Sequence, residues 1–155
     1  MQNPLAGHTN SYHTYSHDEA LAGIAAAGYR YVELSAVPGW TEHVDLGTRP
    51  AETRRQLEGY GLEAVSLSGH SDLTTADGLA HGLEAVRWAA EYGLPIVNTA
   101  VGGHQSADEN EGAFLANVGV CGRRGRGRGR RRARDPRRYH GLERRHHPAA
   151  REDRT

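Results

Sequence analysis

The 155-residue sequence predicts an α/β fold made of repeated, parallel strand–helix units. Three segments align without gaps: AAAGYRYVELS (25–35), EGYGLEAVSLS (58–68) and AEYGLPIVNTA (90–100). Each segment ends a helix-like stretch at a glycine and continues into an apolar run centred on a valine. The period of about 33 residues also suits purely helical repeats, but those lack an apolar strand in every unit. The repeat therefore favours strands that alternate with helices.

The expected elements follow from the apolar runs and from helix-start signals. The strands are expected at residues 6–12, 30–36, 62–69 and 94–101. A capping box or a first-turn proline marks the start of each helix: Ser16-x-x-Glu19, Pro50, Thr74-x-x-Asp77 and Ser106-x-x-Glu109.

Strands that alternate with helices form a parallel sheet with right-handed crossovers. Both a doubly wound sheet and the first half of a (β/α)8 TIM barrel fit this order. A complete barrel takes about 250 residues, so the units in residues 1–119 make about half of one. The sequence contains no glycine-rich phosphate loop and no nucleophile elbow, which favours the half-barrel. The predicted fold is therefore this half-barrel followed by an irregular basic tail.

The charge divides the chain into two parts. The 19 basic residues are all arginine and balance 19 acidic residues, but residues 1–119 carry a net charge of −10 and residues 120–155 one of +10. We therefore expect a partial TIM barrel over 1–119 and an Arg/Gly-rich disordered tail over 120–155.

Three interpretations of the tail remain open. In the first, the tail is a disordered basic segment. In the second, it is an Arg/Gly segment that binds nucleic acid and neutralises phosphates. In the third, it is translated from codons that are read out of frame. The out-of-frame interpretation is favoured, because the GC-rich codons of Arg, Gly, Ala and Pro interconvert under a one-base shift. The shifted message can encode an alanine run and then GVVVLEIHGD, a fifth strand that carries a glutamate.

Several classes of protein are excluded by composition. No apolar run is long enough to span a bilayer, and no signal peptide is recognisable. Cys121 is the only cysteine, which excludes an internal disulfide framework and a Cys-based zinc finger. We expect a cytoplasmic protein.

Ligands of parallel α/β folds bind beyond the carboxyl ends of the strands. The polar residues expected there are Asn10, Tyr12, His13, Glu33, Trp40, His43, His70, Asp72, Asn98 and His104. A histidine follows every predicted strand, and none is expected inside a strand core. Glu33 is the most informative of these residues, because a carboxylate within an apolar strand is costly unless it is paired or ligated.

The segment NSYHTYSHDEALAGIAAAGYRYVELSA resembles the opening of the sugar phosphate isomerase/epimerase group, the xylose isomerase-like TIM barrels. The group's Gly-Phe/Tyr-x-x-Val-Glu-Leu pattern is matched by GYRYVEL, which contains Gly28 and Glu33. The segments YGLEAVSLSGHSDL and YGLPIVNTAVGGH are similar to the group's third and fourth strands. The resemblance covers about residues 5–118.

The resemblance implies an enzyme that uses a divalent metal (Mn, Mg, Co or Zn) to move a proton or hydride beside a sugar carbonyl. The implied roles are catalytic for Glu33 and His70, substrate-binding for Tyr12, His13, Trp40 and Asn98, and metal-binding for His104. The group's main metal ligands come from strands five to eight, which this chain does not reach. The chain alone is therefore expected to be weak or inactive, and need not bind a metal itself.

The expected partner is a sugar or sugar phosphate, with self-association through exposed strand edges and no membrane. Two alternatives remain open. One is an endonuclease IV-like, metal-dependent DNA repair fold, in which His70 and His104 occupy the positions of metal-binding histidines. The acidic body opposes that alternative. The other is a nucleic-acid-binding protein that acts through the Arg/Gly tail, if the tail is genuine.

Overall fold

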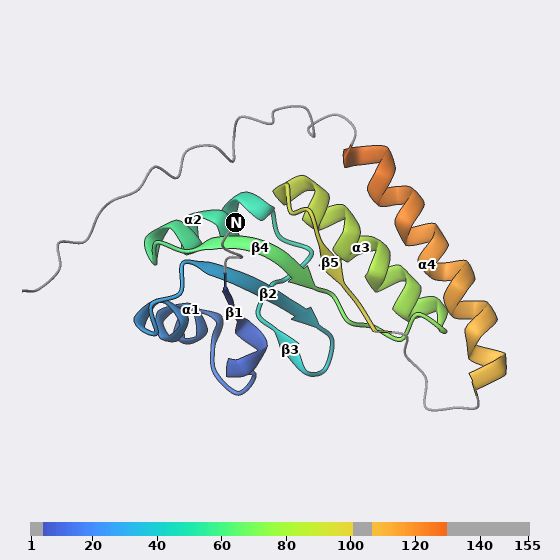
Figure 1. The fold of residues 1–155 in the computed structure, drawn as a ribbon, viewed down its shortest axis with the longest axis horizontal. Coiled ribbons are helices and arrows are strands. Elements are labelled where there is room, and N and C mark those ends of the chain that lie inside the picture. The colour runs from blue at the N-terminus through green and yellow to red at the C-terminus, as the bar shows by residue number, and fades with distance from the viewer. Residues whose placement is uncertain (1–4, 101–106, 130–155) are drawn as a thin grey trace, which may run out of the picture.

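The computed structural model describes residues 5–100 and 107–129, which form strand–helix units in sequence order (Figure 1). The strands are β1 (Ala6–His8), β2 (Tyr31–Val37), β3 (Thr41–Glu42), β4 (Glu63–Ser68) and β5 (Val97–Asn98). The helices are the 3-10 helix η1 (Thr9–Tyr12) and the α-helices α1 (His17–Ala26), α2 (Pro50–Gly59), α3 (Ala76–Tyr92) and α4 (Ala107–Gly129). The α/β class predicted from the sequence is confirmed.

The strand order distinguishes between the two architectures left open by the sequence. The sheet runs β1-β2-β4-β5, and each neighbouring pair is parallel. Only β3 departs from this path, because it pairs with β2 in an antiparallel hairpin. A doubly wound sheet reverses its strand order at a switch point, whereas these parallel strands follow one another without reversal. The order is that of a half-barrel.

The glycine that ends each repeat has a specific backbone role. Gly28, Gly61 and Gly93 have φ values of 84°, 67° and 92°, which glycine adopts without steric cost. Each directly follows a helix or its C-cap residue, so the left-handed residue ends the helix and turns the chain into the next strand. At the other end of α1, the predicted capping box is confirmed: Ser16 Oγ accepts from the Glu19 amide, and Glu19 Oε2 accepts from the Ser16 amide at 2.8 Å.

The predicted strands 30–36 and 62–69 differ by one residue at each end from β2 and β4. Three further boundaries differ from the prediction. The first strand ends at His8, and Thr9–Tyr12 forms η1 instead of continuing it. Within the described residues the fourth parallel strand is only Val97–Asn98, because Pro95 has no N–H to donate to a ladder. The N-cap of α3 is Thr75 rather than Thr74.

Helix α4 lies beside α3, on the side away from the sheet (Figure 1). It begins at Ala107, next to the predicted cap at Ser106, which lies outside the described residues. The helix continues to Gly129 and so includes residues 120–129, the first part of the predicted basic tail. Arginine is a good helix former, and the absence of apolar periodicity concealed this continuation. Residues 130–155 lie outside the described residues, and the division of the chain at 119/120 stays a prediction.

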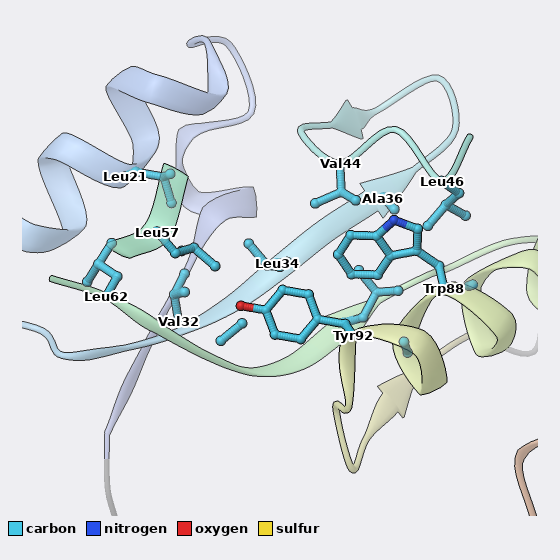
Figure 2. Close-up of a cluster of buried hydrophobic side chains, with 14 of the residues drawn as sticks. Leu21, Val32, Leu34, Ala36, Val44, Leu46, Leu57, Leu62, Trp88 and Tyr92 are labelled. Carbon is cyan, nitrogen blue, oxygen red and sulfur yellow. The ribbon is translucent and has the colours of Figure 1, made fainter. Parts of the chain in front are cut away.

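The core lies on one face of the sheet. Along β2, alternate residues point toward the helices, so Val32, Leu34 and Ala36 are buried while the residues between them point the other way. Figure 2 shows the core as one continuous layer, from Leu57 at the Val32 end to Trp88 at the Ala36 end. Burial of these side chains provides most of the stabilisation that holds the helices on the sheet. Among the described helices, none has the length and apolarity needed to cross a membrane.

Candidate functional site

The face of the sheet opposite the core is polar, and we call it the polar face: His8, Glu33, Ser35, Ser66, Ser68 and His70. Two glycines establish its orientation. A Cβ on Gly7 would lie 2.8 Å from Ile24 of α1, and one on Gly69 would lie 2.7 Å from Ala85 of α3. These glycines therefore face the helices. Because side chains alternate along a strand, the residues beside them, His8, Ser68 and His70, face the other way.

A register shift brings Ser66 level with Glu33. Val32 pairs with Ala64, but the next residue, Glu33, pairs with Ser66, so β4 has one extra residue at Val65. Without this shift the apolar Val65 would lie beside the carboxylate. Such irregularities re-aim side chains next to functional sites. Ser66 Oγ donates a short hydrogen bond to Glu33 Oε2, which holds one oxygen of the carboxylate in place.

The other carboxylate oxygen of Glu33 faces His8. His8 Nε2 lies 3.6 Å from Glu33 Oε1, and the two side chains are 33% and 21% exposed. The pKa of His8 is lowered from its ordinary value, chiefly because burial removes water from the ring. The Glu33 carboxylate acts in the opposite direction, and His70 lowers the pKa further. At neutral pH the polar face therefore presents a neutral imidazole beside a carboxylate.

Several polar atoms of this face have no hydrogen-bond partner among the described residues. They are His8 Nε2, Ser35 Oγ and His70 Nε2, each buried at the atom itself. Buried polar atoms are nearly always satisfied by protein groups or by water. A ligand or water molecule on the polar face would satisfy them, so the arrangement is suited to binding a hydroxylated molecule.

The loops after β1 and β2 form a second group of side chains, which we call the aromatic platform: Asn10, His13, Trp40 and Thr41. Asn10 Oδ1 accepts hydrogen bonds from Trp40 Nε1 at 2.8 Å and from Thr41 Oγ1 at 2.6 Å. His13 stacks on the indole, with ring centroids 4.7 Å apart and planes 10° apart. Trp40 is nevertheless 59% exposed. The result is an oriented, solvent-facing aromatic surface.

A second stacked pair lies in the same loops. The rings of His17 and His43 are 5.7 Å apart and nearly parallel, and His43 Nε2 lies 2.9 Å from the carbonyl oxygen of Tyr15. The pKa of His17 is lowered to about 4, first by burial and then by repulsion from His43, while Asp18 acts in the opposite direction. The pair links the start of α1 to the loop after β3.

The structure brings together some of the predicted site residues and separates others. Glu33 and His70 lie on the polar face, and His13 and Trp40 lie in the aromatic platform. Tyr12 instead lies against Gly23 of α1 and the core, with an edge-on contact to Tyr15.

Asn98 is exposed on β5, in register with Ser68. His104 lies outside the described residues. The roles given to these residues stay predictions.

The sequence reasoning missed four members of the polar face: His8, Ser35, Ser66 and Ser68. The expectation that no histidine lies inside a strand is wrong, because His8 belongs to β1 and pairs with Glu33. Ser66 was not singled out either. A signal was present for Ser66, because the gapless alignment of 25–35 with 58–68 places it level with Glu33.

A divalent metal centre does not fit the described residues. Among residues 5–100 and 107–129, no group of three His, Cys, Asp or Glu side chains is arranged to hold a metal ion. His8 and Glu33 supply at most a pair of donors, whereas metal sites of this kind use three or more protein ligands. The polar face alone is therefore not a metal centre.

Comparison with known proteins supports the architecture. The fold matches the crystal structure of a sugar phosphate isomerase/epimerase from Parabacteroides distasonis with a TM-score of 0.54 at 14% sequence identity. The match covers 83% of this chain and 50% of that chain, so this chain spans about half the length of its structural relative. The protein therefore has the fold of half of a TIM-barrel isomerase. No family model matches the sequence, and no curated protein matches it.

Proposed function

We propose that this chain is half of a sugar or sugar phosphate isomerase/epimerase-like barrel and binds the sugar without turning it over efficiently. The observation that carries the proposal is Glu33, a partly buried carboxylate held between Ser66 and His8 on the polar face. Proton transfer beside a sugar carbonyl needs such a positioned carboxylate. The structural relative is a sugar phosphate isomerase/epimerase.

Each group has a distinct part in this proposal. Glu33 accepts or returns a proton through the carboxylate oxygen that faces His8, while Ser66 fixes the other oxygen. His8, whose lowered pKa keeps the ring neutral, and its neighbour His70 each offer a ring nitrogen to the sugar hydroxyls. Trp40 is held in place by stacking with His13 and by its hydrogen bond to Asn10. Its exposed ring packs against the apolar C–H face of the sugar, as exposed aromatic rings do in binding sites.

Efficient turnover requires groups that the described residues do not supply. A divalent metal would polarise the sugar oxygens, and the described residues do not form a site for one. No step of this proposal therefore passes through a metal. We infer that the full chain shows little aldose–ketose conversion, even with Mn²⁺ added.

Calorimetric titration of the full chain with fructose 6-phosphate tests binding. We expect weak binding, with a Kd of about 1 mM, and an affinity that falls about five- to tenfold in Trp40→Leu, because the aromatic surface is lost. Tyr29→Leu is the matched control, since Tyr29 is also an exposed aromatic residue, at 41%. Equal affinity in all three proteins would contradict the role of Trp40, and absence of binding would overturn the proposal.

An isomerase assay on the same protein tests the second half of the proposal. Metal-stimulated conversion at a rate typical of enzymes, about 1–1000 per second, would show that the chain is active alone. The endonuclease IV-like alternative gains no support, because His104 lies outside the described residues. The nucleic-acid-binding alternative depends on the Arg/Gly tail from residue 120, of which only residues 120–129 are described, as the end of α4.

A further inference from the structure

We propose that two copies of this chain associate edge to edge, with β5 of each copy pairing with β1 of the other, so that their sheets close into one barrel. The described residues of each copy contribute four parallel strands in sequential order, β1-β2-β4-β5. Two such sets supply the eight strands of a closed (β/α)8 barrel. The inference concerns assembly, and it stands whether or not the chain binds a sugar.

The backbone of β5 is available for a further strand. Ile96 O accepts a hydrogen bond from the Leu67 amide at 3.1 Å, and Asn98 O accepts one from the Gly69 amide at 2.9 Å. Successive residues of a strand direct their N–H and C=O groups to opposite sides. The N–H and C=O of Val97 therefore point away from β4, toward the edge of the sheet. Unpaired edges of this kind are templates for another strand.

Both edges carry an exposed apolar side chain at the same end of the strand. Leu5, directly before β1, is 78% exposed, and Ile96, directly before β5, is 57% exposed. Side chains alternate along each strand, so Leu5 lies on the helix-facing side with Gly7, whereas Ile96 lies on the polar face with Asn98. In the parallel register that matches the faces, Leu5 of one copy therefore lies level with Val97 of the other, and Ile96 is enclosed inside the barrel. A twofold axis repeats this contact on the opposite side of the barrel. Pairing thus buries four exposed apolar side chains that a single copy leaves in water.

The polar face gives a second reason for closure. The helices α1 and α3 contact the sheet through its apolar face, at Gly7 and Gly69. The opposite face carries the buried polar atoms of His8, Ser35 and His70 that lack partners among the described residues. Closure places two polar faces toward one shared interior, where groups and water from both copies can satisfy these atoms. Residues 1–119 carry a net charge of −10, which opposes association, and residues 120–155 carry +10, which brings the full chain to zero.

Light scattering after size-exclusion chromatography tests the proposal on the full chain. We expect twice the mass of one chain, and the mass of one chain for Leu5→Lys and Ile96→Lys, because each places a charge at both contacts. Leu115→Lys is the matched control, since Leu115 is also 57% exposed but lies on α4. It should remain dimeric. A monomeric wild type, or a dimer that survives Ile96→Lys, would overturn the proposal, provided that circular dichroism shows each variant to be folded.

Disulfide trapping tests the pairing itself and does not depend on a destabilising substitution. In a Cys121→Ser background, Leu5→Cys and Val97→Cys proteins are mixed under a mild thiol oxidant, because Leu5 and Val97 both lie on the helix-facing side. We expect a disulfide-linked dimer in the mixture and little or none in either protein alone. Efficient crosslinking of Val97→Cys with itself would show a β5–β5 contact, and absence of crosslinking in the mixture would show that the edges do not meet. Either result overturns the proposed closure.

Discussion

His8 shows how burial and charge compete on the polar face. Removal of water lowers its pKa, and the neighbouring Glu33 carboxylate partly reverses that effect, while His70 adds to it. The ring is close enough to Glu33, at 3.6 Å, for the carboxylate to influence its protonation directly. The protonation of His8 is therefore a sensitive measure of the charges placed around it.

Two substitutions should move the pKa of His8 in opposite directions. Glu33→Gln removes a negative charge, so the pKa of His8 should fall further. His70→Asn removes the neighbouring imidazole that lowers the pKa of His8, so that pKa should rise. NMR titration of the His8 ring resonances measures both shifts, and Glu84→Gln, an exposed carboxylate on α3, is the control. If both substitutions leave the titration of His8 unchanged, the side chains do not share one face.

The residues that could be predicted from the sequence are those whose chemistry conflicts with their surroundings. Glu33 was identified because it is a carboxylate in an apolar strand, and Trp40 because it follows a strand end. His8 and Ser66 could not be placed in the same way. Their position beside Glu33 depends on where β1 ends and on the register shift at Val65, and neither is encoded in local periodicity.

At the scale of elements, the helices were predictable and the outer strands were not. Capping residues and left-handed glycines define helix ends locally, so α1 and α2 begin where the sequence indicates. The lengths of β1 and β5 depend instead on how far their neighbours extend, which is a tertiary property. The position of Tyr12 differs from the prediction for this reason. The helix η1 replaces the end of the predicted strand and places the Tyr12 side chain against α1.

The stacked pair of His17 and His43 should make stability depend on pH. The pKa of His17 is about 4 in the folded chain against an ordinary value of 6.5, so the unfolded chain binds the proton more readily. The free energy of unfolding should therefore decrease as the pH falls from about 6.5 to about 4, by about 1–2 kcal/mol once the partial exposure of the ring is allowed for.

Urea denaturation at a series of pH values between 4 and 7 measures this slope. His17→Phe retains an aromatic ring against His43 but cannot take up the proton, so its stability should vary less over the same range. Tyr29→Phe should keep the slope of the wild type, because neither residue titrates there. A slope that is the same in His17→Phe and in the wild type would assign the pH dependence to other groups.

For the whole molecule, the fold class followed from one repeated signal. The alternation of helix, glycine and apolar strand specifies a parallel sheet, and the sequential strand order specifies a half-barrel. The match to half of a known barrel supports that result. The sequence predicts self-association through exposed strand edges, but it does not identify the side chains that reach each edge in three dimensions. Leu5 and Ile96 are recognisable as edge residues only once β1 and β5 are known to be the outermost strands.

Closure of two copies into one barrel predicts that thermal stability depends on protein concentration. Association stabilises the native state only, so each tenfold increase in concentration above the dissociation constant adds about 1.4 kcal/mol per mole of dimer. For a chain of this size, we expect Tm to rise by a few degrees. Differential scanning fluorimetry over a hundredfold range of concentration measures the rise. Leu5→Lys/Ile96→Lys should show a lower Tm that does not change with concentration. If the Tm of the wild type is also independent of concentration, the protein is a monomer whose strand edges remain unpaired, because the Tm of a monomer that unfolds reversibly does not depend on concentration.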